Sequence, residues 1–164
     1  ADGRVVFTSS SSGLYGNFGQ TNYGEAKMAM VGVMNTLHLE GMKYNIKVNC
    51  LAPAAGTEMT KGLFPEPVFD LLSPEAVSPG VVFLCSKDAP SRIVLGDGGG
   101  SFDIFKGFET VGINLLPDAL TAEGVAEHWQ AICDEKGMEE TQSGAEQTQK
   151  FAIQGATKLG LDLS

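Results

Sequence analysis

The chain has 164 residues, of which 43% are hydrophobic and 19% charged, a length and composition typical of a single domain that buries a core. Its 20 Asp and Glu residues outnumber 11 Lys and Arg residues and give a net charge of −9, which argues against nucleic acid or an anionic membrane as a partner. No stretch is long and apolar enough to predict a membrane span, and no secretory signal opens the chain.

The first predicted element is a short β-strand at residues 4–9. A β-rich run followed directly by polar residues and glycine is typical of a buried parallel strand that ends at a ligand crevice. Here the polar residues are the serine run at residues 9–12, which Gly13 follows. We therefore predict that a serine hydroxyl lies at the carboxyl end of this strand, where such sheets carry their ligand sites.

A tyrosine and a lysine stand four residues apart, at Tyr23 and Lys27. Residues at i and i+4 share one face of a helix, so the phenol and the ammonium would point into one site. The cation favours the phenolate form, and a serine can hold a substrate oxygen while the tyrosine gives or takes a proton. This combination predicts hydride-transfer chemistry, although a bare Tyr-x-x-x-Lys also occurs by chance as a surface pair.

A long helix is predicted from Thr21 to about Lys43, followed by a strand at residues 46–52 that Pro53 stops. The helix has too many apolar residues for one narrow stripe: Ala26, Ala29, Met30, Val31, Val33, Met34 and Leu37. A helix that is apolar on two faces must bury both of them. We expect one face to pack on the sheet and the other on a partner subunit.

The middle of the chain is expected to complete the sheet. Residues 54–57 read as a turn of small residues, and residues 58–69 as an irregular, partly helical lid. Ser73 and Pro74 resemble the N-cap and first position of a helix that reaches Ser86. The last strand is expected at residues 91–95, and residues 102–108 continue as an apolar segment. The glycine cluster at residues 96–100 reads as the loop after that strand, because no helix-opening pattern accompanies it as in a phosphate loop.

The character of the sequence changes at Pro117. Thr121 is expected to cap a helix with Val125, Trp129 and Ile132 on one face, whereas residues 139–150 are polar and are expected to be mobile. We therefore divide the chain into residues 1–116, which contain the predicted strands, and residues 117–164, a helical extension with a polar tail.

Several residues carry no predicted chemistry. Cys50, Cys85 and Cys133 lack CxxC or zinc spacing, so we expect reduced and mostly buried thiols and no metal site. His38 and His128 have no partner at ligand spacing. The serine run does not contain the Gly-x-Ser-x-Gly motif of a hydrolase.

The serine run and the Tyr-x-x-x-Lys pattern together resemble the signature of the short-chain dehydrogenase/reductase family. In that signature the catalytic serine stands three residues before a glycine, so Ser10 matches it and Gly13 is the glycine. Residues 13–23, 49–60, 120–123 and 129–133 are also similar to the 3-hydroxyacyl-CoA dehydrogenase domain of peroxisomal multifunctional enzyme type 2 and its bacterial relatives. The resemblance thus extends along most of the chain.

The resemblance implies a role for each matching residue. Tyr23 would remove the hydroxyl proton, Lys27 would hold the nicotinamide ribose and favour the phenolate, and Ser10 would orient the forming carbonyl. The cofactor would contact Tyr23, Lys27 and the turn that contains Pro53, Ala55, Thr57 and Thr60, the two threonines being candidates for the pyrophosphate. The family has glycine directly after the proline more often than the Ala54 found here.

The same resemblance implies that part of the enzyme lies upstream. In a dinucleotide-binding fold the glycine-rich turn follows the first strand, and here that turn and a fourth catalytic residue, an asparagine, would precede residue 1. The resemblance therefore implies an α/β fold in which residues 1–116 are the C-terminal part of a Rossmann-type domain, the C-terminal half of its doubly wound parallel sheet. An N-terminal half in the same or a separate chain would complete it and cover the strand edge that half a sheet leaves open.

The sequence thus favours an oxidoreductase that uses NAD, or alternatively NADP, acts on an acyl-CoA-type 3-hydroxy substrate, forms a homodimer, and is inactive without its N-terminal half. One alternative is a non-catalytic module that dimerises or complements such a half; another is a short-chain reductase with a different hydroxyl or carbonyl substrate. The final residues, Leu161–Ser164, differ from Ser-Lys-Leu. A cytoplasmic location is therefore expected, with the peroxisome left open.

Overall fold

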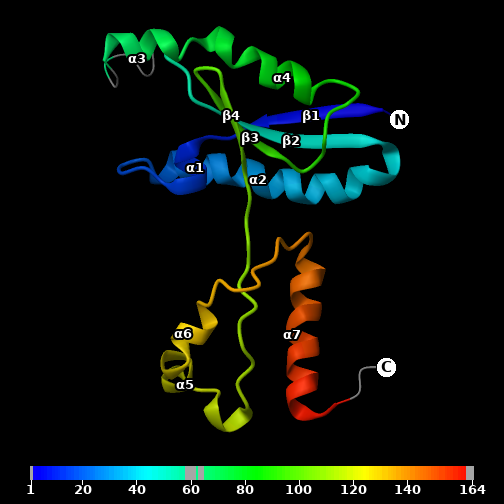
Figure 1. Cartoon of the computed structure of the whole chain (residues 1–164). Helices are drawn as coiled ribbons and strands as arrows, with labels where there is room; N and C mark the ends of the chain where they lie inside the picture. Colours follow the sequence, from blue (N-terminus) through cyan, green and yellow to red (C-terminus); the bar gives the residue numbers. More distant parts are fainter. Residues whose placement is uncertain (1, 58–61, 63–64, 162–164) are drawn as a thin grey trace. The chain divides into compact units, whose positions relative to one another are not determined.

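The structure, a computed structural model, describes residues 2–57, 62 and 65–161 (Figure 1). Its contacts group into two compact units, Ala1–Phe105 and Lys106–Ser164. The domain boundary expected after residue 116 stays a prediction.

The first unit is built on a four-stranded sheet in the order β1-β2-β3-β4, counted over the described residues. The strands are β1 (Gly3–Thr8), β2 (Ile46–Pro53), β3 (Val94–Gly98) and β4 (Ser101–Phe105). The predicted strands at residues 4–9 and 46–52 are confirmed, and the third begins at Val94 rather than at residue 91. The first three strands run parallel, as in the expected Rossmann-type α/β fold, with β1 at one edge of the sheet.

β4 is a strand that the sequence did not predict. It pairs antiparallel with β3, with Gly98 opposite Ser101. Between them Gly99 and Gly100 have φ angles of +57° and +80°, and positive φ at both central residues is the geometry of the two-residue turn that best joins twisted antiparallel strands. The expected loop is therefore only Gly99 and Gly100, because the other residues of the glycine cluster belong to β3.

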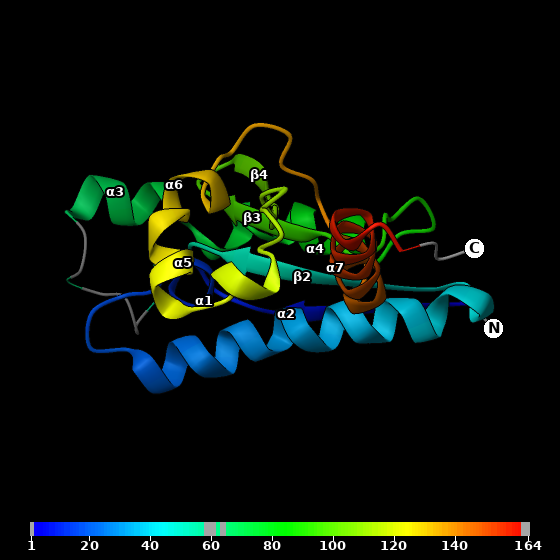
Figure 2. The ribbon, with the colours of Figure 1, turned by 90° about the horizontal axis from the view of Figure 1, so that it is seen from below.

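Helices cover both faces of this sheet, with α1 and α2 on one and α3 and α4 on the other (Figures 1 and 2). Their bounds are α1 (Ser11–Tyr15), α2 (Thr21–Gly41), η1 (Met42–Tyr44), α3 (Glu66–Leu71), η2 (Pro74–Ala76) and α4 (Ser78–Leu84). On the α2 face the buried cluster is Val31, Met34, Val48, Cys50, Ala52 and Val94. On the α4 face it is Leu51, Leu84 and Leu95. Successive residues of the buried central strands thus point to opposite faces of the sheet and pack against different helices.

The long helix α2 is apolar on two sides, as its sequence indicates. Val31 and Met34 are buried against the sheet, whereas Met28, Val33 and Leu39 are 43%, 45% and 47% exposed. The sheet therefore satisfies one apolar face and leaves the other on the surface of the unit.

The segment Glu66–Leu84 has a mean hydropathy of 1.2 and, by length and composition alone, passes the test for a membrane-crossing helix, contrary to our expectation that no stretch would. The structure breaks it into α3, η2 and α4, whereas a span needs about 20 continuous helical residues. Ser73 and Pro74 begin the 3₁₀ turn η2, and the expected α-helix starts only at Ser78. The Ser73 side chain makes no capping hydrogen bond.

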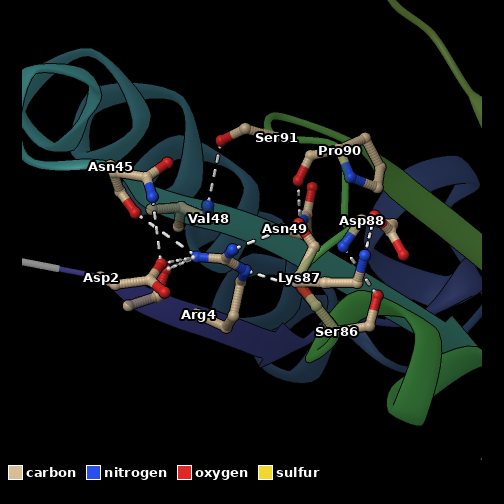
Figure 3. A network of polar contacts seen from close by, with 11 residues as sticks. Asp2, Arg4, Asn45, Val48, Asn49, Ser86, Lys87, Asp88, Pro90 and Ser91 are labelled. Atoms are coloured by element: carbon tan, nitrogen blue, oxygen red, sulfur yellow. Dashed lines mark hydrogen bonds and ion pairs between the residues drawn. The ribbon is translucent and has the colours of Figure 1, made fainter.

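Figure 3 shows a polar network around Arg4 of β1. The Arg4 guanidinium donates to the carbonyl oxygens of Ser86 at 2.8 Å and of Lys87 at 3.4 Å. It also pairs with the Asp2 carboxylate at 2.7 Å. Because the five N–H donors of an arginine form a rigid fork, this side chain ties the loop after α4 to the sheet edge.

A second tie runs through the buried side chain of Asn49 in β2, which is 0% exposed. Its Nδ2 donates to the carbonyl oxygen of Pro90 at 2.9 Å, and its Oδ1 accepts the N–H of Ile93 at 3.0 Å. Beside it, the N–H of Val48 donates to Ser91 Oγ at 3.0 Å (Figure 3). These bonds satisfy backbone groups of β2 and of the segment just before β3, and so help to set where that strand enters the sheet.

The second unit contains η3 (Pro117–Ala119), α5 (Ala122–Glu127), α6 (Trp129–Ile132) and α7 (Gly144–Leu159). Thr121 caps α5 as predicted, accepting the N–H of Gly124 at 3.0 Å, but the helix breaks at His128. Residues 139–150, which the sequence predicts to be polar and mobile, contain the start of α7, so they are helical from Gly144 onward. Ser143 Oγ accepts the N–H of Glu146 at 3.2 Å and Glu146 accepts the N–H of Gln142 at 2.7 Å, a variant of the capping box.

Polar contacts from one face of α7 hold the extended segment at residues 109–111. Lys150 Nζ lies 2.8 Å from the Glu109 carboxylate and 3.2 Å from the Thr110 carbonyl oxygen. Gln147 also donates to Glu109, and Gln154 donates to the Val111 carbonyl oxygen at 2.9 Å. The hydrogen bond from Lys150 is the main reason that the pKa of Glu109 lies below the ordinary value of a glutamate.

The three cysteines differ in exposure. Cys50 is buried in the α2-face cluster, and burial raises the pKa of its thiol to about 11. Cys85 and Cys133 are exposed, so the expectation of mostly buried thiols is wrong for these two.

We expect Asn49→Ala to destabilise the protein by about 2–6 kcal/mol, because a buried polar group left without its partner costs about 1–3 kcal/mol and two groups lose theirs. Urea unfolding of the variant measures the change. The control is Asn17→Ala at an exposed position, where a loss within about 0.5 kcal/mol is expected. Equal stabilities for the two variants would show that Asn49 does not carry this tie.

The Glu109 contacts predict a stability that depends on pH. Because the pKa of Glu109 is lower in the folded chain, the stabilisation is present above the ordinary glutamate pKa and is lost as pH falls through the folded value. The unfolding free energies of wild type and Glu109→Gln should therefore differ at pH 7 and converge as pH falls below the folded pKa of Glu109. Glu135→Gln, in an exposed turn, is the control. A difference that persists at acid pH would contradict the assignment.

Candidate active site

Ser10 lies at the point where β1 ends and α1 begins. It is 9% exposed, and its Oγ accepts the N–H of Ser12 at 3.2 Å as the N-cap of α1. Because the hydroxyl acts as an acceptor in this contact, its own O–H stays available as a donor. Such a group can donate to a substrate oxygen at the carboxyl end of the strand.

Lys27 anchors α2 to the end of β1. Its Nζ donates to the carbonyl oxygen of Thr8 at 3.0 Å, and its own carbonyl oxygen accepts Ser9 Oγ at 2.8 Å. The same Nζ lies 5.6 Å from the centre of the Tyr23 ring. An ammonium has three donors, of which the Thr8 contact uses one. The structure therefore places Tyr23 and Lys27 together beside the strand end that leads into Ser10, and it makes Ser9 a structural tie.

The approach of α1 to α2 depends on Gly13. A Cβ built on Gly13 would lie 2.9 Å from both the Cβ of Lys27 and the N of Met28. Those atoms belong to the helix itself and cannot swing aside as a side-chain end would. Only glycine lets the two helices come this close, so Gly13 fixes the distance between the serine turn and the Tyr23–Lys27 face.

The turn after β2 lies beside the end of β1, at the carboxyl ends of the parallel strands, because Thr8 is the register partner of Leu51. Within it the N–H of Ala54 donates to the carbonyl oxygen of Asp97 at 2.7 Å. Pro53 ends β2, and Ala55 and Thr57 follow in the turn. Thr60 falls outside the described residues.

A cavity of about 390 Å³ opens between this turn, α1 and the β3–β4 hairpin. Its lining comprises Ser11, Leu14, Tyr15, Ala52, Ala54, Gly96, Asp97, Gly98, Ser101, Phe102 and Asp103. Ser11 follows Ser10, and Ala52 and Ala54 flank Pro53, so the cavity adjoins both predicted parts of the site. Its volume is within the range of small-molecule sites. The sequence did not predict the part of the lining that β4 contributes, residues 101–103, because it depends on the pairing of β4 with β3.

The two histidines are used in packing. His38 Nδ1 lies 2.8 Å from Ser91 Oγ, and His128 Nδ1 lies 2.8 Å from the Gly124 carbonyl oxygen. Desolvation, followed by the charge of Arg92, lowers the pKa of His38. Over the described residues no group of three or more His, Cys, Asp or Glu side chains could hold a metal ion.

Comparison with known proteins gives consistent matches. A family model described as short chain dehydrogenase matches residues 1–67. A protein of Mycobacterium tuberculosis named as a short-chain type dehydrogenase/reductase is 46% identical over 136 residues, which are 82% of this chain and 47% of that protein. The peroxisomal multifunctional enzyme type 2 of Mus musculus is 38% identical over 155 residues, 89% of this chain and 20% of that protein.

The fold is also found among solved structures. The full-length peroxisomal multifunctional enzyme type 2 from Drosophila melanogaster matches with a TM-score of 0.82 at 30% identity, over 93% of this chain and 28% of that one. The expected Rossmann-type α/β fold is therefore confirmed. The chain spans less than half the length of each of these three proteins.

We expect Gly13→Ala to destabilise the protein, because the added methyl would clash with the backbone of α2. The matched control is Gly32→Ala within α2, where an added Cβ meets nothing within 4 Å. That variant should be stabilising by up to about 1 kcal/mol, the difference in helix propensity. Chemical unfolding measures both changes, and a neutral Gly13→Ala variant would show that the helices do not need this close contact.

Proposed function

Because this chain belongs to the short-chain dehydrogenase/reductase family, we propose that its protein oxidises a 3-hydroxyacyl-CoA to the 3-oxoacyl-CoA with NAD. The observation that carries the proposal is the contact of Lys27 Nζ with the Thr8 carbonyl oxygen at 3.0 Å, since it holds the Tyr23–Lys27 face at the strand end beside Ser10. The resemblance to peroxisomal multifunctional enzyme type 2, which extends over most of the chain, supports the acyl-CoA substrate.

Three side chains carry the proton chemistry in this proposal. The Ser10 O–H donates to the substrate hydroxyl oxygen and orients it as it becomes a carbonyl. Tyr23 accepts the hydroxyl proton, and the Lys27 ammonium near its ring stabilises the negative charge that the phenol oxygen carries before the transfer. Held in fixed positions, these groups act without the entropy cost of collecting them in solution.

The residues present fit a nicotinamide cofactor. The ammonium of Lys27 has donors beyond the one that Thr8 uses. Like the turn after β2, this ammonium lies at the carboxyl ends of the parallel strands. Tyr23 and Lys27 would hold the ribose; Pro53, Ala55, Thr57 and Thr60 would follow the nicotinamide and pyrophosphate. When bound, NAD supplies the hydride acceptor. NADP stays an alternative, because the residue that would select between them belongs to the N-terminal half.

Two partners belong to the proposal. The first is that N-terminal half, in the same or a separate chain, because β1 pairs only with β2 among the described strands and its other edge is open. The second is another copy of the chain, packed on the outer face of α2 through Met28, Val33 and Leu39. The cytoplasmic location stays a prediction beside relatives whose names place them in peroxisomes.

Three variants of the full-length protein that contains this chain test the proposed roles. Tyr23→Phe should lower kcat by about 10²–10⁴-fold, the usual loss of a general acid or base. Lys27→Ala should lower kcat and also weaken NAD binding, whereas Ser10→Ala should lower kcat with little change in NAD affinity. NADH formation from a 3-hydroxyacyl-CoA and calorimetric NAD binding measure the two effects.

The chain provides matched controls for this experiment. At the other end of α2, Lys43 Nζ lies 4.9 Å from the Tyr44 ring centre, a pair with the same chemistry. Tyr44→Phe and Lys43→Ala should leave kcat unchanged. Ser10→Thr keeps both the hydroxyl and the helix cap, so it should retain more activity than Ser10→Ala. If Tyr23→Phe keeps more than about a tenth of wild-type kcat, the role given to this tyrosine is wrong.

A further inference from the structure

In the part of the chain described, the 390 Å³ cavity beside Ser10 is lined by acidic residues but not by basic ones. Among its described lining residues the carboxylic acids are Asp97 and Asp103, and there is no Lys, Arg or His. Apolar atoms of the wall come from Leu14 and the Tyr15 ring of α1 and from Ala52 of β2, whereas Phe102, the register partner of Asp97, points to the same face as Asp97. The Tyr15 ring packs edge-on against Phe105 at 5.8 Å, which fixes this wall.

The Asp97 carboxyl lies on the opposite face of the sheet from α1. It contacts Gly80 of α4, where a Cβ would collide with its Oδ2, and it follows Leu95, which packs in the α4-face cluster. Both of its oxygens are buried, and neither has a hydrogen-bond partner within the part of the chain described. Burial raises the pKa of this carboxyl. Asp97 therefore borders the cavity with its backbone.

The Asp103 carboxylate lies on the cavity side. Asp103 is the register partner of Gly96, and a Cβ on Gly96 would collide with its Oδ1. Gly96 is two residues after Val94, which packs in the α2-face cluster, so the missing side chain leaves room over the face that carries α1. The Asp103 carboxylate occupies that room, and Asp103 is an exposed, solvated residue.

We propose that Asp103 is a specificity-determining residue that makes this cavity accept an uncharged acyl portion and disfavour one that carries a second negative charge, such as a terminal carboxylate. The inference rests on the proposed function. Apolar walls suit a hydrocarbon chain. A carboxylate brought near Asp103 meets like-charge repulsion that no lining cation offsets, and it loses part of its hydration.

The test compares kcat/KM for two 3-hydroxyacyl-CoA substrates of equal chain length, one ending in a methyl and one in a carboxylate. In the full-length enzyme Asp103→Asn should reduce the preference for the methyl substrate by about 5–10-fold, the size of a like-charge interaction across several ångströms near a protein surface. Turnover of the methyl substrate should stay within about 2-fold, because an isosteric amide keeps the packing. Asp88→Asn, an exposed acid in the loop after α4, should leave the preference unchanged (Figure 3).

Ionic strength and a second variant give independent readouts. Added salt should reduce the wild-type preference and leave that of Asp103→Asn nearly constant. Gly96→Ala pushes the carboxylate out of its place without removing it and should shift the preference in the same direction. An unchanged preference in Asp103→Asn, or a wild-type preference that is insensitive to salt, overturns this inference while turnover of the methyl substrate leaves the proposed function standing. Failure to oxidise either substrate overturns both.

Discussion

The candidate site depends on one contact, the packing of the second turn of α2 on the end of β1. Three features meet there: the Lys27 ammonium on the Thr8 carbonyl, the Ser9 hydroxyl on the Lys27 carbonyl, and the absence of a side chain at Gly13. Each is weak or ordinary alone, but together they fix a helix face against a strand end. Without this contact the serine turn and the Tyr23–Lys27 face would be separate surface features.

The two units of the chain are stabilised in different ways. The first has apolar clusters on both faces of its sheet, with buried polar ties such as Asn49 where β3 begins. In the second unit only Gly124 and Ala156 are buried among the described residues, and polar side chains of α7 hold the chain at residues 109–111. Burial of apolar area is the main source of folding free energy, so the second unit is expected to open locally at lower cost than the first.

Local charge in the first unit differs along the sheet edge. The Lys27 cation lies at the end of β1, and the Asp103 carboxylate lies on β4, at the far side of the cavity. The net charge of −9 is a property of the whole chain and does not predict the charge at either of these two positions. A ligand with charged and uncharged parts therefore meets an oriented environment, which favours one direction of binding over the reverse.

Local sequence was sufficient for the features that depend on nearby residues. The strands β1 and β2, the helix α2 with its two apolar faces, and the proximity of Tyr23 to Lys27 follow from periodicity and i, i+4 spacing. The roles of the site residues stay proposals, because geometry alone does not test a proton transfer.

Tertiary structure decided what depends on contacts between distant segments. It gave different roles to two adjacent serines. Ser9 bonds to α2, whereas Ser10 caps α1 and keeps its O–H as a donor. It made β4 a strand, because Gly99 and Gly100 turn the chain back onto β3. It paired α7 with the segment at residues 109–111, because Glu109, more than 30 residues before that helix, accepts hydrogen bonds from Gln147 and Lys150. Such pairings join residues that no local window contains together, so the sequence by itself could not predict them.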